Sequence, residues 1–275
     1  MKTVTIIVAI AVIAVSAFAL ISCGQSDDNK VFAFSIADKI DALIYANYVG
    51  QNQGGDNQSP SVSDQDTLVV SLTNGLNVRS GKGTSYSSLG TLDKGDMVSF
   101  IALEDGWYKT VYKERVAYVS ANSSYSTLYR MDKGDEKVES VITVGKSLLG
   151  YPYVWGSQRY HWGNGILNAN FVAGEFDCSA LTQYAYYKGA GVLLDVTTRT
   201  QVLQGVRVTR DNLKRGDLMF FTNSSRYNLT GTERVGHVAI YLGDNYILHT
   251  ASDHAVVEQI SSKRWSYFIE GRRVL

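Results

Sequence analysis

From Thr67 onward the sequence alternates short strand-like runs with turns that contain Gly, and this rhythm constrains the fold more than any other feature. The predicted strands lie near 67–72, 76–79, 97–103, 107–112 and 115–119. Turns with Gly separate them at 81–83, 93–95 and 104–106. Because Gly tolerates the backbone angles that reversals need, these positions mark where the chain folds back between strands. Five short strands at this spacing predict a small all-β barrel over residues 67–130.

The second half of the chain mixes helical and strand-like segments. Helices are predicted over 137–149 and 178–189, and a closing strand near 270–274. The first helix must end before Pro152, since Pro disfavours helical geometry in the residue ahead of it. Gly191 is expected to help end the second helix. An α+β domain is therefore predicted over residues 131–275.

Composition narrows the classes of protein to which the chain can belong. It has 275 residues, 45% of them hydrophobic, which is enough for two modest domains with buried cores. Lys and Arg together number 26, as do Asp and Glu, so no charge excess points to a nucleic acid partner. The 2 cysteines are too few for a disulfide-rich scaffold or a zinc site built on four thiolates. We expect no nucleic acid partner, no metal and no other cofactor.

Residues 1–22 are typical of a secretion signal, because Lys2 is followed by a long apolar stretch. An uncleaved membrane helix is the alternative. The stretch ends in Leu20-Ile21-Ser22-Cys23, which resembles a lipobox. This resemblance implies cleavage before Cys23 and lipidation of its thiol. It predicts a protein anchored through lipid to a membrane of the cell envelope, facing the periplasm or the exterior.

Residues 23–66 are expected to form a lipidated N-terminus and a spacer. Apolar residues at helical spacing over 35–50 predict a short helix that either packs on the body or belongs to a stalk. Residues 51–66 are polar and read as a flexible linker. A disulfide between Cys23 and Cys178 is the competing fate of the two thiols, and lipidation of Cys23 excludes it.

Cys178 is the candidate nucleophile. Asp177 is a plausible N-cap, which places Cys178 in the first turn of the predicted helix. Backbone N–H groups and the dipole at a helix start stabilise a thiolate, so its pKa is expected to fall below the usual value of about 8.5. A buried, inert Cys is the alternative.

Two histidines on a predicted hairpin supply the base that such a nucleophile needs. His237 and His249 lie in strand-like runs joined by a turn at 243–245. With a three-residue loop, His249 falls opposite Ala239 and one diagonal step from His237, on the same sheet face. In that register His237 takes the thiol proton and His249 orients His237. Hydrogen-bonded core histidines are the alternative.

Segments of the sequence resemble two known families. LNVRSGKGTSYSSLGTLDKGD (76–96) followed by GWYKTVY (106–112) resembles a bacterial SH3-like domain, although Lys82 and Tyr118 depart from its usual Pro and Trp. Such modules bind cell-wall peptide or shape a neighbouring active site, and a structural spacer is the alternative. GYPYVWG, FDCSAL, LKRGDLMFF, GHVAIYLG and YILHT resemble, in that order, an NlpC-type cell-wall cysteine peptidase.

The second resemblance implies a papain-like α+β catalytic domain preceded by the SH3-like barrel. It assigns Cys178 as nucleophile, His237 as base, His249 as third member and Tyr153 as a hydroxyl beside the oxyanion. The residues that it assigns to substrate binding are Asp177, Ser179 and Trp155. In relatives with an SH3-like module, the residues matching the first two of these hold the free amine of an N-terminal L-Ala.

The family is known to cleave the γ-D-glutamyl to diamino-acid bond, so the partners implied are peptidoglycan stem peptides or muropeptides. A cysteine amidase or acyltransferase acting on another wall amide is one alternative, and a catalytically silent wall-binding lipoprotein is another. Residues 157–175 are longer than the usual link between the Trp-Gly and Cys segments, as a lid or groove wall would be. Within and beyond this insertion, His161 and His254 are expected to be exposed loop residues.

Overall fold

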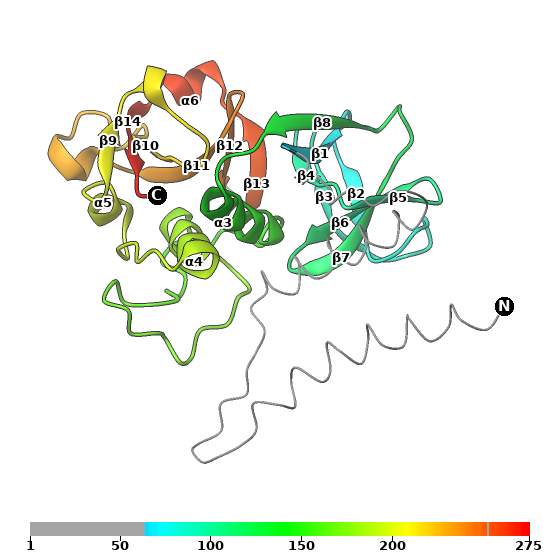
Figure 1. Cartoon of the computed structure of the whole chain (residues 1–275), viewed down its shortest axis with the longest axis horizontal. Coiled ribbons are helices and arrows are strands. Elements are labelled where there is room, and N and C mark those ends of the chain that lie inside the picture. Colours follow the sequence, from blue (N-terminus) through cyan, green and yellow to red (C-terminus); the bar gives the residue numbers. More distant parts are fainter. Residues whose placement is uncertain (1–63, 252) are drawn as a thin grey trace, which may run out of the picture. The chain divides into compact units, whose positions relative to one another are not determined.

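The structure is a computed structural model that describes residues 64–251 and 253–275 (Figure 1). The predicted signal, Cys23, the helix over 35–50 and most of the spacer lie outside the described residues. Within those residues, no helix combines the length and the apolar character needed to cross a membrane.

Residues 65–132 form eight strands. They are β1 (Gln65–Ser71), β2 (Leu76–Arg79), β3 (Ser88–Leu92), β4 (Met97–Ser99), β5 (Ala102–Glu104), β6 (Trp107–Tyr112), β7 (Arg115–Ser120) and β8 (Ser126–Asp132). They pair as two sheets, in the orders β4-β1-β8 and β3-β2-β7-β6-β5. Lys113 and Glu114 join β6 to β7 with φ of 50° and 56°, the two positive angles that a two-residue hairpin requires.

The prediction of an all-β module is confirmed, with two strands more than expected at β3 and β8 and one predicted strand divided into β4 and β5. Both added strands lack an apolar run. β8 pairs along its whole length with β1 at the start of the module. The strand that stabilises β8 is therefore distant in the sequence, and no local pattern predicts the pairing. Closure of the two sheets into a barrel stays a prediction.

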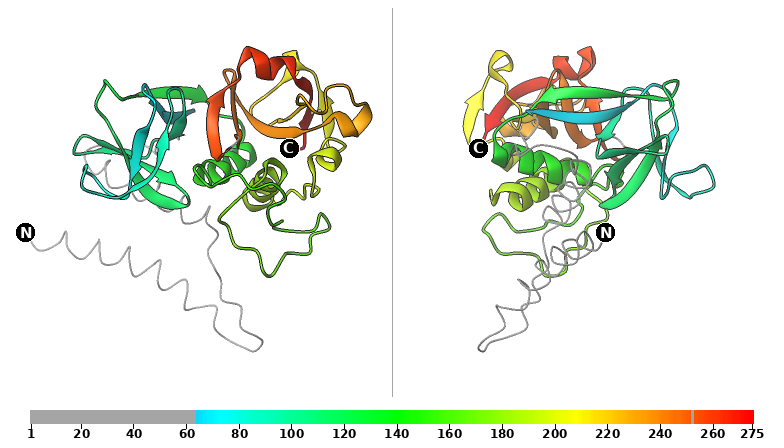
Figure 2. Two further views of the ribbon diagram at one scale, coloured as in Figure 1. Left: turned by 180° about the vertical axis from the view of Figure 1, so that it is seen from behind. Right: turned by 45° about the vertical axis from the view of Figure 1, so that its right-hand side comes forward.

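Residues 136–273 build a six-stranded antiparallel sheet and the helices beside it. The helices are α3 (Glu136–Ser147), α4 (Cys178–Ala190), α5 (Thr198–Gln201) and α6 (Ser262–Ser266), with short 3-10 turns at Arg210–Asn212 and Gly231–Arg234. The strands are β9 (Val206–Val208), β10 (Leu218–Phe221), β11 (His237–Gly243), β12 (Tyr246–Thr250), β13 (Ala255–Gln259) and β14 (Phe268–Arg273). The sheet order is β13-β12-β11-β10-β14-β9, and α3 and α4 lie together on one side of it (Figure 2).

The two predicted helices of this region are confirmed as α3 and α4. Asp135 caps α3 by accepting a hydrogen bond from the backbone N–H of Val138. Asp177 caps α4 in the same way, and Gly191 ends α4 with the left-handed angle (φ 68°) that favours Gly there. The first nine residues of α4 are all buried, so this helix is a core element that holds its N-terminus in a fixed place.

The ring of Tyr112, in β6, occupies a gap between two glycines. A side chain at Gly90 of β3 or at Gly150, which follows α3, would overlap that ring. Gly150 also has a φ of +86°, an angle that other residues rarely adopt. Absence of a side chain at both positions is therefore what lets the strand module pack directly against the end of α3.

Candidate active site

The chain segment before α4 sets the position of Cys178. The backbone N–H of Phe176 donates to the carbonyl of Pro152 at 3.0 Å, and that of Val154 donates to Phe176 at 3.2 Å. Asp177 then starts the helix, so Cys178 occupies its first turn as predicted. Cys178 is 8% exposed, which leaves the sulfur at the edge of the core rather than in solvent.

The hairpin of β11 and β12 has the predicted register. Ile240 pairs with Leu248 and Tyr241 with Ile247, and continuing this register sets His249 opposite Ala239. As a result the two imidazoles meet on one face, with His237 Nε2 at 2.9 Å from His249 Nδ1. The geometric part of the prediction is confirmed, while the catalytic roles of both residues stay predictions.

Glu258, on β13, completes this line of hydrogen bonds and fixes the direction of each one. Its Oε1 is 3.0 Å from His249 Nε2. A carboxylate only accepts, so His249 Nε2 carries a proton and, in the neutral ring, His249 Nδ1 accepts one. His237 Nε2–H is then the donor, and the lone pair of His237 is on Nδ1. Within the described residues this Nδ1 has no hydrogen-bond partner.

The electrostatics keep both rings neutral at rest. Burial lowers the pKa of His237 well below its usual value, and the nearby His249 and Arg264 lower it further. Burial also lowers the pKa of His249, against the opposing effect of Glu258. Burial favours the neutral form of Glu258, yet His249 and Arg264 prevail and lower its pKa. Glu258 is thus the charged end of the line, and His237 is its neutral, basic end.

Cys178 differs from the sequence prediction in its resting charge. Burial raises the pKa of the thiol to about 12, with the adjacent Asp177 acting in the same direction. The backbone N–H groups of Val238 and Ser179 and the charge of Arg159 oppose this rise without cancelling it. The expectation of a lowered pKa is therefore wrong for the resting protein, because desolvation outweighs the helix start. The contact with Val238 also sets the sulfur beside the residue that follows His237.

Tyr153 lies within electrostatic reach of the sulfur. Its pKa is raised by burial, then by Cys178 and Asp177, so the hydroxyl keeps its proton and remains a donor. The backbone N–H of Tyr153 donates to the carbonyl of Asp253 at 2.8 Å, and its bridge to Phe176 ties it to the start of α4. The structure thus brings Tyr153 near the sulfur of Cys178, while its oxyanion role stays a prediction.

Asp177 and Ser179 are brought together with a residue that the sequence analysis missed. Arg159 Nη2 lies 2.8 Å from Asp177 Oδ2 and 3.2 Å from Ser179 Oγ. Arg159 comes from the predicted insertion at 157–175. No spacing rule signals this contact, since the insertion folds back on α4 without regular secondary structure.

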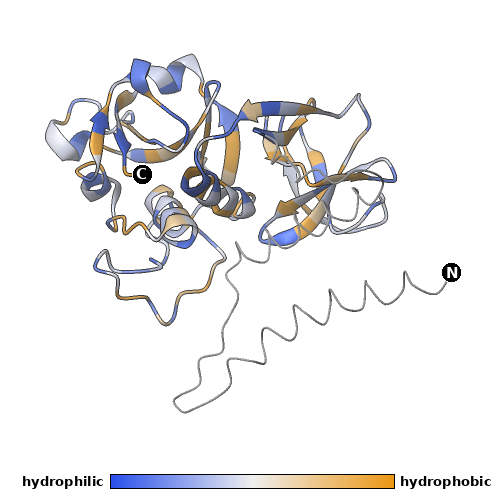
Figure 3. Cartoon of the chain, viewed as in Figure 1, coloured by the Kyte–Doolittle hydropathy of each residue, from blue (hydrophilic) through white to orange (hydrophobic). Residues whose placement is uncertain are grey.

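The other predicted positions are an exposed residue, a residue outside the described part of the chain and two histidines. Trp155 is 85% exposed, and Trp162 in the insertion is exposed as well. Apolar stretches alternate with polar ones along the loop that precedes α4 (Figure 3). Cys23 cannot be placed. The exposed position predicted for His161 is wrong, because its ring is fully buried against Tyr160 and Tyr187.

His254 also departs from its predicted solvated loop. It is half-buried, forms a bridge with Pro152, and its Nδ1 is 3.0 Å from Asp253 Oδ1. Across the described part of the chain, no group of three or more His, Cys, Asp or Glu residues is arranged to hold a metal ion.

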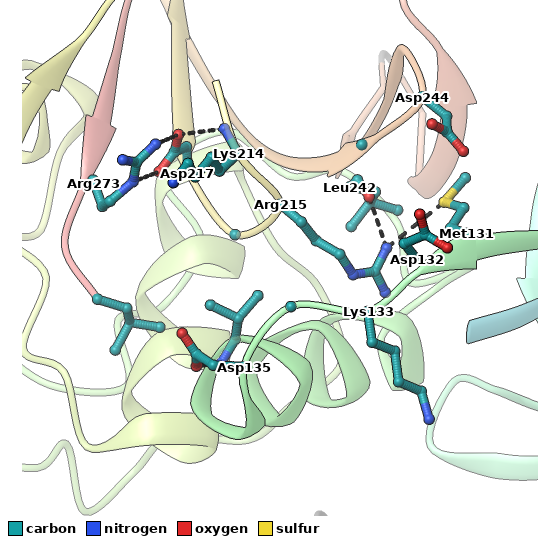
Figure 4. Close-up of a pocket in the computed structure, with 15 residues that line it drawn as sticks. Met131, Asp132, Lys133, Asp135, Lys214, Arg215, Asp217, Leu242, Asp244 and Arg273 are labelled. Atoms are coloured by element: carbon teal, nitrogen blue, oxygen red, sulfur yellow. Dashed lines mark hydrogen bonds and ion pairs between the residues drawn. The ribbon is translucent and has the colours of Figure 1, made fainter. Parts of the chain in front are cut away.

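A pocket of about 490 Å³ lies elsewhere, at the opposite end of β10 and β11 from His237. Figure 4 shows Arg273 bound to Asp217 on one side of it and Arg215 directed at Leu242 and Met131 on the other. These basic groups are engaged by protein atoms, and the pocket is separate from the catalytic candidates.

Glu258 is the residue of the site that a sequence pattern could have revealed. Val256 lies opposite His249, so Glu258 is two residues along β13 and shares the face of that imidazole. The signal is the apolar run Ala255-Val256-Val257, with two β-branched valines, shortly after the second His strand, which predicts a third strand with an acidic residue on the His face.

Comparisons with known proteins find two family models along the chain. Residues 150–274 match the model of the NlpC/P60 family, and residues 74–127 match that of the bacterial SH3 domain. The chain is 34% identical over 157 residues to the peptidoglycan DL-endopeptidase CwlO of Bacillus licheniformis, covering 55% of this chain and 31% of that protein. It is 32% identical over 146 residues to a γ-D-glutamyl-L-lysine dipeptidyl-peptidase of Bacillus cereus, covering 52% and 38%.

The chain thus spans about a third of the length of the curated relatives that it matches. Among solved structures, an NlpC/P60 family protein from Bacillus cereus aligns with 23% identity and a TM-score of 0.41, over 76% of this chain and 64% of that one.

Proposed function

Residues 150–274 are an NlpC/P60 domain that follows a bacterial SH3 domain, and from this premise we propose that the chain is a peptidoglycan hydrolase. More finely, we propose a cysteine endopeptidase that cleaves the γ-D-glutamyl to diamino-acid bond of stem peptides. The observation that carries the proposal is the hydrogen-bonded line Glu258–His249–His237, which leaves one ring nitrogen of His237 open. The thiol of Cys178 lies at a helix start and accepts a hydrogen bond from the backbone of Val238, the residue after His237.

The reaction follows from the resting charges. Thiol and imidazole are both neutral, so the proton passes from Cys178 to His237 Nδ1 as the sulfur attacks the carbonyl carbon. The positive charge that forms on His237 is stabilised through His249 by the carboxylate of Glu258. The carbonyl oxygen becomes an oxyanion, for which the hydroxyl of Tyr153 and the backbone N–H groups at the start of α4 are the nearby donors.

Collapse of this intermediate breaks the C–N bond, and the imidazolium gives its proton to the departing amine. Water then attacks the thioester while His237 takes one of its protons. The C–S bond breaks, the thiol recovers its proton, and the D-glutamyl carboxylic acid leaves. Each of the two steps uses the same nitrogen first as base and then as acid.

We propose the envelope as the site of action, with Cys23 lipidated after removal of residues 1–22. The lipobox-like sequence and a peptidoglycan substrate both support an extracytoplasmic location. A protein so anchored meets stem peptides at the membrane-facing side of the wall. The mass of the mature N-terminal peptide tests this: diacylglyceryl-Cys23 supports the anchor, and a peptide beginning at Met1 contradicts it.

Incubation of defined muropeptides with full-length protein tests the activity. The wild type should release products that end at D-glutamate, and Cys178→Ala should release none. Cys23→Ser is the matched control, since it removes the other thiol and should keep the rate. EDTA should also leave the rate unchanged. Free lactyl-sugar would instead show an amidase, and an unchanged substrate would show a silent binding protein.

A further inference from the structure

Arg159 neutralises the carboxylate that lies next to the nucleophile. Oδ2 of Asp177 accepts from Arg159 Nη2 at 2.8 Å and from the backbone N–H of Gly156 at 3.2 Å. Oδ1 accepts from the backbone N–H of Ala180 at 2.8 Å and from Ser179 Oγ at 2.9 Å. Both oxygens of this buried group are therefore engaged by protein donors.

The guanidinium is held in place from its other side as well. Nε of Arg159 donates to the carbonyl of Val196 at 2.7 Å, and Nη1 donates to that of Ser157 at 2.8 Å. The side chain is only 13% exposed. Every nitrogen of the Arg159 guanidinium donates to an acceptor, and most of the side chain is buried. Arg159 is therefore held in a fixed position rather than being a mobile surface side chain.

This arrangement limits which kind of N-terminus a peptide substrate can have. An enzyme that releases N-terminal dipeptides has to bind an α-ammonium two residues before the bond it cuts, and a buried ammonium needs a carboxylate partner. Here the carboxylate adjoining Cys178 already has a cation. A second cation brought to the same place would be repelled by Arg159 and would find no free lone pair on Asp177.

We propose that Arg159 determines the substrate class of this chain: stem peptides whose N-terminal L-Ala is acylated, as in peptide still joined to the wall, and not peptides with a free amine. This inference rests on the proposed function and refines it. The chain should act as an endopeptidase within the stem, and the guanidinium should take the place that a substrate ammonium would otherwise fill.

The first test compares two substrates of the wild-type, full-length protein: L-Ala-γ-D-Glu-L-Lys-D-Ala with a free amine and the same peptide N-acetylated. A second pair carries diaminopimelate in place of Lys. We expect kcat/KM for the acetylated peptide to be higher by about tenfold or more, the effect of one charged contact. A preference for the free amine would overturn this inference alone. Cleavage of neither form would overturn the proposed function, and this inference with it.

The second test changes Arg159. In Arg159→Gln the carboxylate of Asp177 is left without a cation, so the acetylated-to-free ratio of kcat/KM should fall about tenfold, chiefly through a lower KM for the free amine. Arg159→Lys keeps the charge and should keep the ratio. Arg207→Gln, on the edge strand β9, is the matched control. A ratio unchanged in a folded Arg159→Gln protein would contradict the proposal, and the wild-type comparison decides the matter if that variant does not fold.

Discussion

Two lines of buried polar side chains run through the structure, and they end differently. In one, Asp66 of β1 binds Lys146 of α3 and Arg215, and Arg215 binds Glu139 of α3. In the other, Glu258 binds His249, which binds His237. Every charge of the first line has a partner of opposite sign, whereas the second stops at an open ring nitrogen. The fully paired line is suited to stabilising the fold, and the line that ends in an unpaired nitrogen is suited to accepting a proton.

The difference is also visible in the pKa values. Burial of Asp66 favours its neutral form, but Lys146 and Arg215 prevail and lower its pKa. In the open line no opposite charge reaches His237, and burial lowers its pKa without opposition. The charged partners of the closed line thus connect β1 to α3, whereas the imidazole of His237 stays neutral and able to accept a proton.

Breaking the closed line should have the largest effect. Asp66→Asn leaves two buried cations with one carboxylate, and we expect the free energy of unfolding to fall by about 3–5 kcal/mol. Denaturation in guanidinium chloride measures this. Since the folded-state pKa of Asp66 is lowered, its contribution is present above the usual aspartate pKa of about 4 and is lost as pH falls through the folded-state value.

A matched control for this variant is Asp105→Asn, which breaks the exposed ion pair with Lys82. Its unfolding midpoint should match that of the wild type. An unchanged midpoint for Asp66→Asn itself would show that the closed line does not hold the molecule together.

Breaking the open line should cost activity more than stability. Glu258→Leu removes the acceptor that sets the proton positions. Because His237 itself remains, kcat/KM should fall about 10- to 100-fold, less than the roughly 10²–10⁴-fold that acid–base catalysis as a whole contributes. Glu258→Gln keeps an acceptor without the charge and should lose less. In both variants His249 loses the anion that favours its charged form. A proton shared by His249 and His237 is then held less strongly, so the acidic limb of the kcat/KM profile should move to lower pH.

The pH profile separates this role from a structural one. Equal losses in the Gln and Leu variants, with the acidic limb unmoved, would mean that Glu258 does not act through the imidazoles.

The smallest effect is expected at a residue that belongs to neither line. Trp155 is 85% exposed, so Trp155→Ala should change the free energy of unfolding by no more than about 0.5 kcal/mol. If the indole covers bound peptide as predicted, KM should rise about three- to tenfold, as when one aromatic contact is lost. Leu203→Ala, which removes an exposed apolar side chain outside the insertion, is the control and should keep the wild-type KM. A KM equal to that of the wild type would remove Trp155 from the binding residues.

What the sequence predicts well in this chain is local. The caps of α4, the turn between β11 and β12 and the shared face of the two histidines all follow from neighbouring residues and strand periodicity. What it misses depends on contacts between distant segments. Asp66 and Arg215 are far apart in the sequence but form an ion pair, and β8 pairs with the equally distant β1. Arg159, which forms an ion pair with Asp177, lies in a segment without helical or strand periodicity.

The resting charge of Cys178 also depends on contacts between distant segments, so the sequence alone predicts it wrongly. A helix start acts locally and lowers the thiol pKa, but the burial that raises it comes from the packing of α4 against the sheet. Local motifs therefore identify the candidate reactive atoms, and the packing of the surrounding core sets the protonation state of the resting thiol.

The fit of Tyr112 between Gly90 and Gly150 has a consequence for how such chains diversify. The ring and one glycine belong to the strand module, while the other glycine opens the catalytic domain. A gene fusion that replaced the module with an unrelated one would discard the ring but leave the bare backbone that accommodates it. The two modules are therefore expected to be inherited together. Hybrid proteins in which the strand module is exchanged should need compensating substitutions at this junction before the two modules pack together.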